Sequence, residues 1–118
     1  MLYDQLRSGK QRFIDYTDTL FSDKNNNEEK YYIYRDEFNS CKNKKRRAAL
    51  FVFLNRHCYN GLCRYNSKGV FNTPFGRYKQ PLLPRKEMTH FIQAAKTASF
   101  DCADYQDTMD QAEIGDVI

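Results

Sequence analysis

Hydrophobic positions recur at helical spacing through the first half of the chain. Over residues 1–21 most apolar side chains lie three or four positions apart, and a Ser-Gly pair interrupts the series, which predicts one helix or two short ones. Asn27, followed by two glutamates, is a typical helix start and predicts a helix over residues 28–38. Asn43 is suited to cap a third helix over residues 44–56.

The third predicted helix presents Ala48, Phe51, Val52 and Asn55 on one face, and it begins with four consecutive basic residues. Positive charge at a helix N-terminus opposes the helix dipole and costs about a few tenths of a kcal/mol per charge. A functional demand for positive charge would explain this mismatch.

Helical periodicity fails between residues 59 and 84, where turn residues are frequent. The β-prone residues 70–73, preceded by residues 63–65 and a turn, predict a short hairpin. Pro84 suits the first turn of a fourth helix that ends near residue 98. The last part predicts a short strand at residues 98–103, a weak helix at 105–112 and the start of another strand at 116–118. The expected fold class is mainly α with a short β-hairpin.

Composition narrows the class of protein. A chain of 118 residues has room for one compact domain, and its nine Phe and nine Tyr argue against intrinsic disorder. Apolar runs are too short to span a membrane, and the first residues do not resemble a secretory signal, so we expect a cytoplasmic protein with reduced thiols. No metal site is expected, because the cysteines form no C-x2-C pair: Cys41, Cys58, Cys63 and Cys102.

Charge is strongly segregated along the chain. Residues 42–86 contain 12 basic residues and no acidic one, whereas residues 1–41 have six basic and eight acidic residues and residues 87–118 have one and seven. The three segments therefore carry +12, −2 and −6. Such a basic block, rich in aromatic residues and asparagines, favours a polyanionic partner, above all nucleic acid. A basic surface around an ordinary aromatic core fits the composition equally well.

Two adjacent motifs carry a family resemblance. Residues 54–66 read LNRHCYNGLCRYN, and residues 69–79 read GVFNTPFGRYK. Together they closely resemble the target-recognition region of Dam-type DNA adenine-N6 methyltransferases, most densely over residues 34–81. The chain departs from the family pattern at His57 and Cys58, which leaves the backbone turn before Tyr59 in doubt.

The resemblance implies roles for three residues that read bases. Arg64 would donate two hydrogen bonds to guanine O6 and N7 in the sequence GATC, a contact worth about 1–3 kcal/mol of discrimination. Leu62 and Pro74 resemble an apolar pair that meets a thymine methyl group. Without the family, Arg64 would be interpreted as a phosphate contact or an exposed charge, and the other two as core or turn residues.

The resemblance also implies a wedge and a set of phosphate contacts. Tyr59 and Asn60 resemble residues that enter the duplex beside the target adenine, with Asn60 bonding the base left unpaired when the adenine flips out. An ordinary Asn-Gly turn is the alternative for Asn60, and a core position is the alternative for Tyr78, which resembles an aromatic residue near the DNA. The expected contacts to the DNA backbone are Arg35, Arg56, Asn66, Asn72, Arg77 and Lys79.

The family's catalytic motifs do not occur in this sequence. Members bind S-adenosylmethionine through a Phe-x-Gly-x-Gly loop and use an Asp-Pro-Pro-Tyr motif, so we expect no cofactor for this chain alone and no methylation by it. Residues 22–98 are then interpreted as a target-recognition domain, flanked by fragments of a Rossmann-like catalytic domain at 1–21 and 99–118. Asp104 and Tyr105 resemble a remnant of the cofactor pocket, and the chain resembles an excised middle segment of such an enzyme.

The resulting hypothesis is a module that binds double-stranded DNA, reads GATC and supports adenine flipping for a missing catalytic portion. One alternative is a subunit of an active S-adenosylmethionine-dependent methyltransferase that a second chain completes. Another is an interaction fragment without DNA function, in which unpaired strands join copies of the chain into a homo-oligomer.

Overall fold

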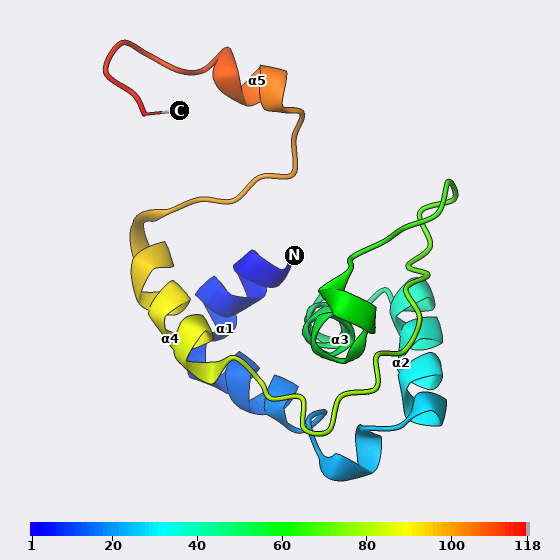
Figure 1. Cartoon of the computed structure of the whole chain (residues 1–118). Helices are drawn as coiled ribbons and strands as arrows, with labels where there is room; N and C mark the ends of the chain where they lie inside the picture. Colours follow the sequence, from blue (N-terminus) through cyan, green and yellow to red (C-terminus); the bar gives the residue numbers. More distant parts are fainter. Residues whose placement is uncertain (118) are drawn as a thin grey trace.

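Helices carry most of the regular backbone in the computed structural model, which describes residues 1–117 (Figure 1). Three longer helices come first, and two shorter ones follow a long irregular segment: α1 (Leu2–Asp18), α2 (Glu28–Ser40), α3 (Lys44–His57), α4 (Arg85–Ala94) and α5 (Tyr105–Met109). Single 3-10 turns lie at η1 (Asp23–Asn25), η2 (Tyr59–Gly61) and η3 (Ala95–Thr97). The mainly α class expected from the sequence is confirmed.

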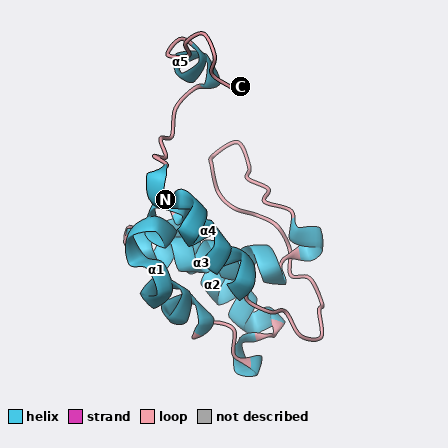
Figure 2. Cartoon of the chain, turned by 90° about the vertical axis from the view of Figure 1, so that its left-hand side faces the viewer, coloured by secondary structure: helices cyan, strands magenta, loops and turns pink. Residues whose placement is uncertain are grey.

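Helix α3 is the centre of the fold. It packs against α1 on one side and α2 on the other, and α4 lies against α1 (Figures 1 and 2). Ala48 and Val52 are buried as the pattern predicts, whereas Phe51 and Asn55 are only half buried. Leu50 and Leu54 have no exposed surface. Burial extends beyond the predicted face, because a helix with neighbours on two sides buries most of its circumference.

The predicted helix starts are confirmed in atomic detail. The side-chain oxygen of Asn27 accepts the Lys30 backbone N–H, and that of Asn43 accepts the Arg46 backbone N–H, each at 2.9 Å. Helix α1 is interrupted at Lys10, whose φ of 51° and ψ of −135° lie outside the helical region. This interruption follows the Ser-Gly pair at which the sequence predicts a break.

The hairpin expected over residues 63–73 does not form as a ladder. Two isolated antiparallel bridges, Tyr65 with Phe71 and Cys58 with Phe75, are the only β pairing within residues 1–117. The physical reason is that side chains of this segment replace the next backbone partners: the Arg64 N–H donates to the Thr73 hydroxyl, and the Val70 N–H donates to the Asn66 side-chain oxygen. The backbone groups of Phe71 point away from Tyr65 and bind α2 instead: the Asn39 amide donates to the Phe71 carbonyl at 3.0 Å and accepts the Phe71 N–H at 2.8 Å.

The C-terminal segment extends away from the helical body (Figures 1 and 2). The strand predicted at 98–103 is wrong, and so is the strand start at 116–117, because no neighbouring strand lies beside either segment; residue 118 lies outside the described residues. Helix α5 confirms the weak helix predicted over residues 105–112. Helix α1 shares the core with α3, while the division at residues 21 and 98 and the Rossmann-like character of the flanks stay predictions.

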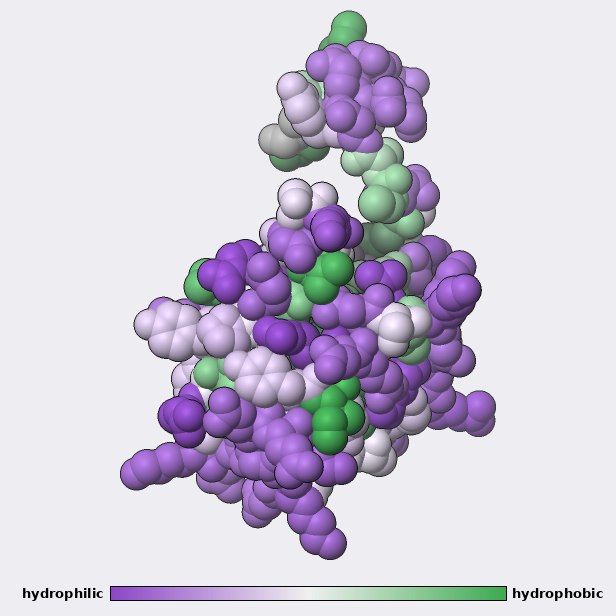
Figure 3. Space-filling model, turned by 90° about the vertical axis from the view of Figure 1, so that its right-hand side faces the viewer, coloured by the Kyte–Doolittle hydropathy of each residue, from purple (hydrophilic) through white to green (hydrophobic). Residues whose placement is uncertain are grey.

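The polar character of the surface agrees with the low mean hydropathy of −0.84. On the face over α2 and the long irregular segment, hydrophobic residues form small separated patches in a hydrophilic surround (Figure 3). None of the helices described is long and apolar enough to cross a membrane.

Candidate nucleic-acid interface

The motif residues gather at the C-terminal end of α3 and along α2. Helix α3 ends at His57, and Cys58 turns the chain into an extended conformation with φ −80° and ψ 162°. The next turn contains two left-handed residues, Asn60 at φ 52° and Gly61 at φ 65°. Asn and Gly tolerate this conformation best, so the Asn-Gly pair is required by the local geometry whatever its function.

The expected wedge is exposed. The Tyr59 side chain is 53% exposed, and Asn60 is also exposed. Their backbone is fixed from behind, because the Tyr59 N–H donates to the Pro74 carbonyl and the Asn60 N–H donates to the Tyr78 hydroxyl, each at 2.9 Å. A rigid turn therefore projects two free side chains from the end of α3.

Arg64 is also at the surface, where its guanidinium donates two hydrogen bonds to a single residue. Nε donates to the Asn72 side-chain oxygen at 2.9 Å, and Nη2 donates to the Asn72 carbonyl at 3.1 Å. The Arg64 backbone N–H donates to the Thr73 hydroxyl at 3.2 Å. The guanidinium is thus neither turned into the core nor free in solvent.

Helix α2 supports this segment with a row of polar side chains. The Tyr31 hydroxyl donates to the Thr73 carbonyl at 2.7 Å, and Arg35 Nη1 donates to the same oxygen at 3.3 Å. Asn39 clasps the backbone of Phe71, as described above. The spacing of 31, 35 and 39 puts all three on one helix face. The i, i+4, i+8 spacing of these three residues can be read from the sequence. The sequence does not indicate that they bind the backbone of a segment more than 30 residues away.

Leu62 and Pro74 lie on neighbouring segments at the surface. The buried Thr73 hydroxyl donates to the Leu62 carbonyl at 2.6 Å, which ties the two segments together. Leu62 is 47% exposed, and Pro74 is exposed as well. Both apolar residues are therefore accessible from solvent, and their contact with a thymine methyl group stays a prediction.

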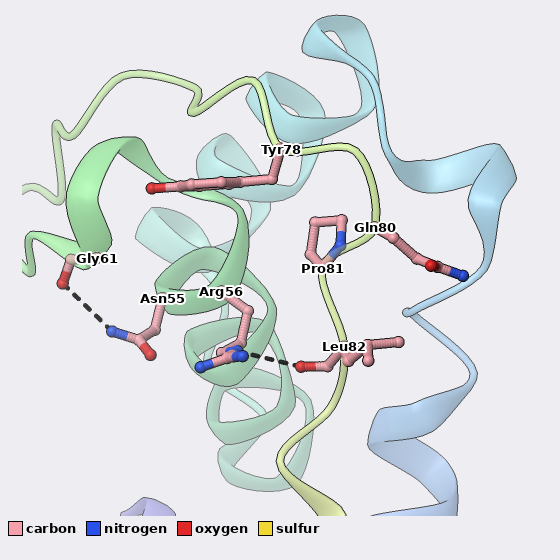
Figure 4. Close-up of a pocket in the computed structure, with 7 residues that line it drawn as sticks. All are labelled: Asn55, Arg56, Gly61, Tyr78, Gln80, Pro81 and Leu82. Atoms are coloured by element: carbon pink, nitrogen blue, oxygen red, sulfur yellow. Dashed lines mark hydrogen bonds between the residues drawn. The ribbon is translucent and has the colours of Figure 1, made fainter.

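A shallow pocket of about 390 Å³ lies behind the wedge turn (Figure 4). Tyr78 forms one wall, with its hydroxyl directed toward η2. The Asn55 amide donates to the Gly61 carbonyl at 3.3 Å, and Arg56 Nε donates to the Leu82 carbonyl at 3.1 Å. The remaining lining residues are Gln80 and Pro81. Tyr78 is 42% exposed, so it is not a core residue.

The expected DNA-backbone residues have varied surroundings. Arg77 forms an exposed ion pair with Glu28 at 3.3 Å, and Lys79 is exposed. The Asn66 side-chain oxygen accepts the Lys68 and Val70 backbone N–H groups and so shapes the loop tip.

Two further residues of this set make contacts within the protein. Arg35 is half buried with its guanidinium 4.6 Å from the centre of the Tyr32 ring, and Asn72 holds Arg64. Their contacts with DNA stay predictions.

The basic residues of segment 42–86 lie in more than one region of the structure. Arg46 pairs with Glu37, which lowers the pKa of that carboxyl through a side-chain hydrogen bond. The Lys45 ammonium lies 4.4 Å from the centre of the Tyr16 ring, and the Arg47 guanidinium lies 4.9 Å from that of Phe38. These cations stand at the start of α3, about 20 Å along the helix from the wedge turn. Intramolecular partners thus account for much of the charge that opposes the helix dipole.

Buried titratable groups beneath the surface are structural. Burial raises the pKa of the Cys58 thiol to about 11 and also raises the pKa of the Tyr31 hydroxyl. Burial lowers the pKa of His57, whose Nδ1 lies 2.8 Å from the Phe53 carbonyl. These groups stay neutral near pH 7, which is suited to an apolar core. The four cysteines are free thiols.

Asp104 and Tyr105 are separate from the other candidate residues. Both are exposed in the extended C-terminal segment, where the Asp104 side chain accepts the Gln106 N–H at 2.9 Å and caps α5. Across residues 1–117 no group of three His, Cys, Asp or Glu side chains is arranged to hold a metal ion.

Comparison with known proteins reveals a family match over the full chain. The model of the D12 class of N6 adenine-specific DNA methyltransferases matches residues 1–118. The chain is 47% identical to the DNA adenine methylase of Serratia marcescens over 117 residues, which are 99% of this chain and 43% of that protein.

Two further relatives give the same result. The DNA adenine methylase of Escherichia coli (strain K12) is 44% identical over 99% of this chain and 42% of its own length. That of Vibrio cholerae is 40% identical over 98% of this chain and 42% of its own. The chain thus spans less than half the length of these relatives.

Proposed function

Because the chain belongs to the D12 class of N6 adenine-specific DNA methyltransferases, we propose that residues 56–79 bind duplex DNA and recognise the sequence GATC. Arg64 donates to guanine O6 and N7, and Leu62 with Pro74 contacts a thymine methyl group. Arg56, Arg77 and Lys79 neutralise phosphates and set the orientation of the protein on the duplex.

One observation carries this proposal. The Arg64 guanidinium lies exposed beside an exposed apolar pair and an exposed tyrosine, on a backbone that side chains of α2 hold in place. An ordinary basic surface over an aromatic core would not require this arrangement. Sequence readout does require it, because a bidentate contact depends on a fixed donor geometry.

The wedge turn supports a second part of the proposal. Tyr59 enters the duplex beside the target adenine, and Asn60 hydrogen-bonds the base that is left unpaired when the adenine leaves the helix. The rigid backbone of this turn favours such a role, since a wedge must resist the stacking energy of the bases that it separates.

The methyl donor of the family is S-adenosylmethionine, and the described residues do not fit it. Asp104 and Tyr105 are exposed, and Asp104 is occupied as the cap of α5. We therefore assign cofactor binding and methyl transfer to parts of the longer relatives that lie outside the matched region, and no step proposed here uses the cofactor.

Fluorescence anisotropy with labelled duplexes tests the recognition step. The chain is titrated against a GATC duplex and a scrambled duplex of the same composition at several salt concentrations. We expect tighter binding of GATC, and Arg64→Ala should reduce the ratio of the two affinities by about 5-fold to about 150-fold. Equal binding of both duplexes by the parent chain would overturn the proposal and favour an interaction fragment.

Adenine flipping is tested with 2-aminopurine in place of the target adenine, because its fluorescence rises when it unstacks. The parent chain should raise the signal of the GATC duplex, and Tyr59→Ala should reduce this rise at saturating protein. Lys68→Ala, a change at the loop tip, is the matched control and should leave the rise unchanged. A flat signal with the parent chain would remove the wedge role while leaving sequence recognition intact.

A further inference from the structure

The Arg64 side chain uses only one edge of its guanidinium within the protein. This planar group has five N–H donors. Nε and Nη2 donate to the side-chain and backbone oxygens of Asn72 at 2.9 and 3.1 Å. Within the described residues Nη1 donates to no other group, and Nη2 keeps a second N–H. The edge formed by Nη1 and Nη2 therefore stays open.

Asn72 is well placed to orient this group because both of its chain neighbours are anchored. Phe71 is clasped by Asn39, and the Thr73 carbonyl accepts hydrogen bonds from Tyr31 and Arg35. The Asn72 backbone N–H also donates to the Arg64 carbonyl at 3.0 Å. The Asn72 backbone thus occupies a fixed position relative to α2, which fixes its carbonyl oxygen and the point from which its side-chain oxygen extends.

We propose that Asn72 is a positioning residue that holds the Arg64 guanidinium in the plane needed to read guanine, and that it is not primarily a phosphate contact. This inference rests on the proposed function. The hydrogen bonds to Asn72 occupy the Nε edge of the guanidinium. The open edge, formed by Nη1 and Nη2, presents two parallel N–H donors, which match guanine O6 and N7.

The physical advantage lies in the free protein. An unrestrained arginine populates many rotamers, and ordering it on binding reduces affinity for the correct site. A guanidinium already held by two acceptors loses less freedom when it meets guanine. It also cannot easily rotate toward a phosphate when the base is wrong. The two hydrogen bonds to Asn72 therefore increase discrimination between correct and incorrect bases more than they raise overall affinity.

The first test measures, without DNA, how strongly Asn72 restrains the motion of the Arg64 guanidinium. The ¹⁵N order parameter of the Arg64 Nε–H reports motion of the guanidinium. We expect a restrained value in the parent chain and a value below about 0.6 in Asn72→Ala. Asn72→Asp retains an acceptor for Nε and should keep Arg64 restrained. A mobile Arg64 in the parent chain would overturn the inference without bearing on the proposed function.

The second test measures discrimination by anisotropy, with the GATC duplex and one in which the guanine is replaced. Asn72→Ala should lower the affinity ratio about tenfold, and Asn72→Asp should restore most of it. Asn72→Leu keeps side-chain volume without the acceptor and replaces the alanine variant if that one fails to fold. Lys79→Ala is the phosphate-contact control and should weaken both duplexes equally.

The outcomes separate the two proposals. If Asn72→Ala weakens both duplexes equally, like Lys79→Ala, the residue is a phosphate contact and the inference is wrong. If Asn72→Asp fails to restore the ratio, the acceptor is not what matters and the inference is also wrong. An unchanged ratio in Arg64→Ala would contradict the proposed function itself.

Discussion

Gly76 lies at a crowded backbone position of the candidate interface. A Cβ atom there would lie 2.7 Å from the Cys58 carbonyl oxygen and 2.6 Å from Cε2 of Tyr78. The Gly76 N–H also donates to the His57 carbonyl at 2.9 Å, so the segment cannot withdraw without losing this bond. We expect Gly76→Ala to lower the free energy of unfolding by about 2 kcal/mol, measured by urea denaturation.

Gly69 provides the control for that substitution. It has a φ of +75°, but a Cβ atom there would meet no atom within 4 Å. Gly69→Ala should therefore cost only the strain of the left-handed backbone, about 1 kcal/mol. Equal losses in the two variants would show that crowding at Gly76 is not the cause.

His57 gives the fold a dependence on pH. The ring is 1% exposed and stacks on Phe53 with 3.9 Å between ring centres. Burial lowers its pKa in the folded state, so below about pH 6.5 the unfolded chain binds the proton more readily. Stability is then fully present above the unfolded pKa and decreases as the pH falls toward the folded pKa, by at most about 1.4 kcal/mol per pH unit.

Urea midpoints measured between pH 7.5 and pH 5 test this dependence. The variant His57→Gln lacks the titrating ring, and its stability should change less over this range than that of the parent chain. Other ionisable groups are common to both proteins, so the difference between the two pH profiles isolates His57. Parallel profiles would mean that the buried ring does not titrate as its surroundings imply.

At the level of elements, local signals in the sequence were sufficient for the helices but not for the loop. The caps at Asn27 and Asn43 act within three residues, and both are confirmed. The predicted hairpin is reduced to the Tyr65–Phe71 bridge, and the loop is held on α2 by Asn39, which lies 32 residues from Phe71, so no local signal in the sequence indicates this contact. Likewise, the positions of Tyr59 and Arg64 at the surface followed from a family resemblance and could not be derived from periodicity.

Helix α2 and the loop of residues 62–74 should therefore be coupled. Asn39→Ala removes two hydrogen bonds to Phe71 and leaves a partly buried backbone N–H and C=O without partners. We expect a loss of about 2 kcal/mol in stability and faster proteolysis within residues 64–70. The cap variant Asn27→Ala is the control, because a loss of about 1 kcal/mol at the start of α2 should leave the cleavage rate of the loop almost unchanged. Equal acceleration in both variants would contradict the coupling.

For the whole molecule, the charge that the sequence presents as one block serves two purposes. Arg46 is held by Glu37 and lies against Tyr34, with its guanidinium 5.6 Å from the ring centre. Arg77 pairs with Glu28, but its side chain is 80% exposed. An exposed pair of this kind contributes little to stability, and its cation can exchange a carboxylate for a phosphate. Arg46 is thus a structural cation, whereas Arg77 is the cation that we propose binds a phosphate.

Paired measurements on Arg77→Ala and Arg46→Ala test this partition. Arg77→Ala should change the free energy of unfolding by less than about 0.5 kcal/mol. It should also reduce the slope of log K against log salt concentration for a DNA duplex by about 0.9. Arg46→Ala should lower stability by about 1 kcal/mol and leave the slope unchanged, because its charge is already neutralised by Glu37. If both variants reduce the slope equally, the start of α3 also contacts DNA, and the binding surface extends along the whole helix.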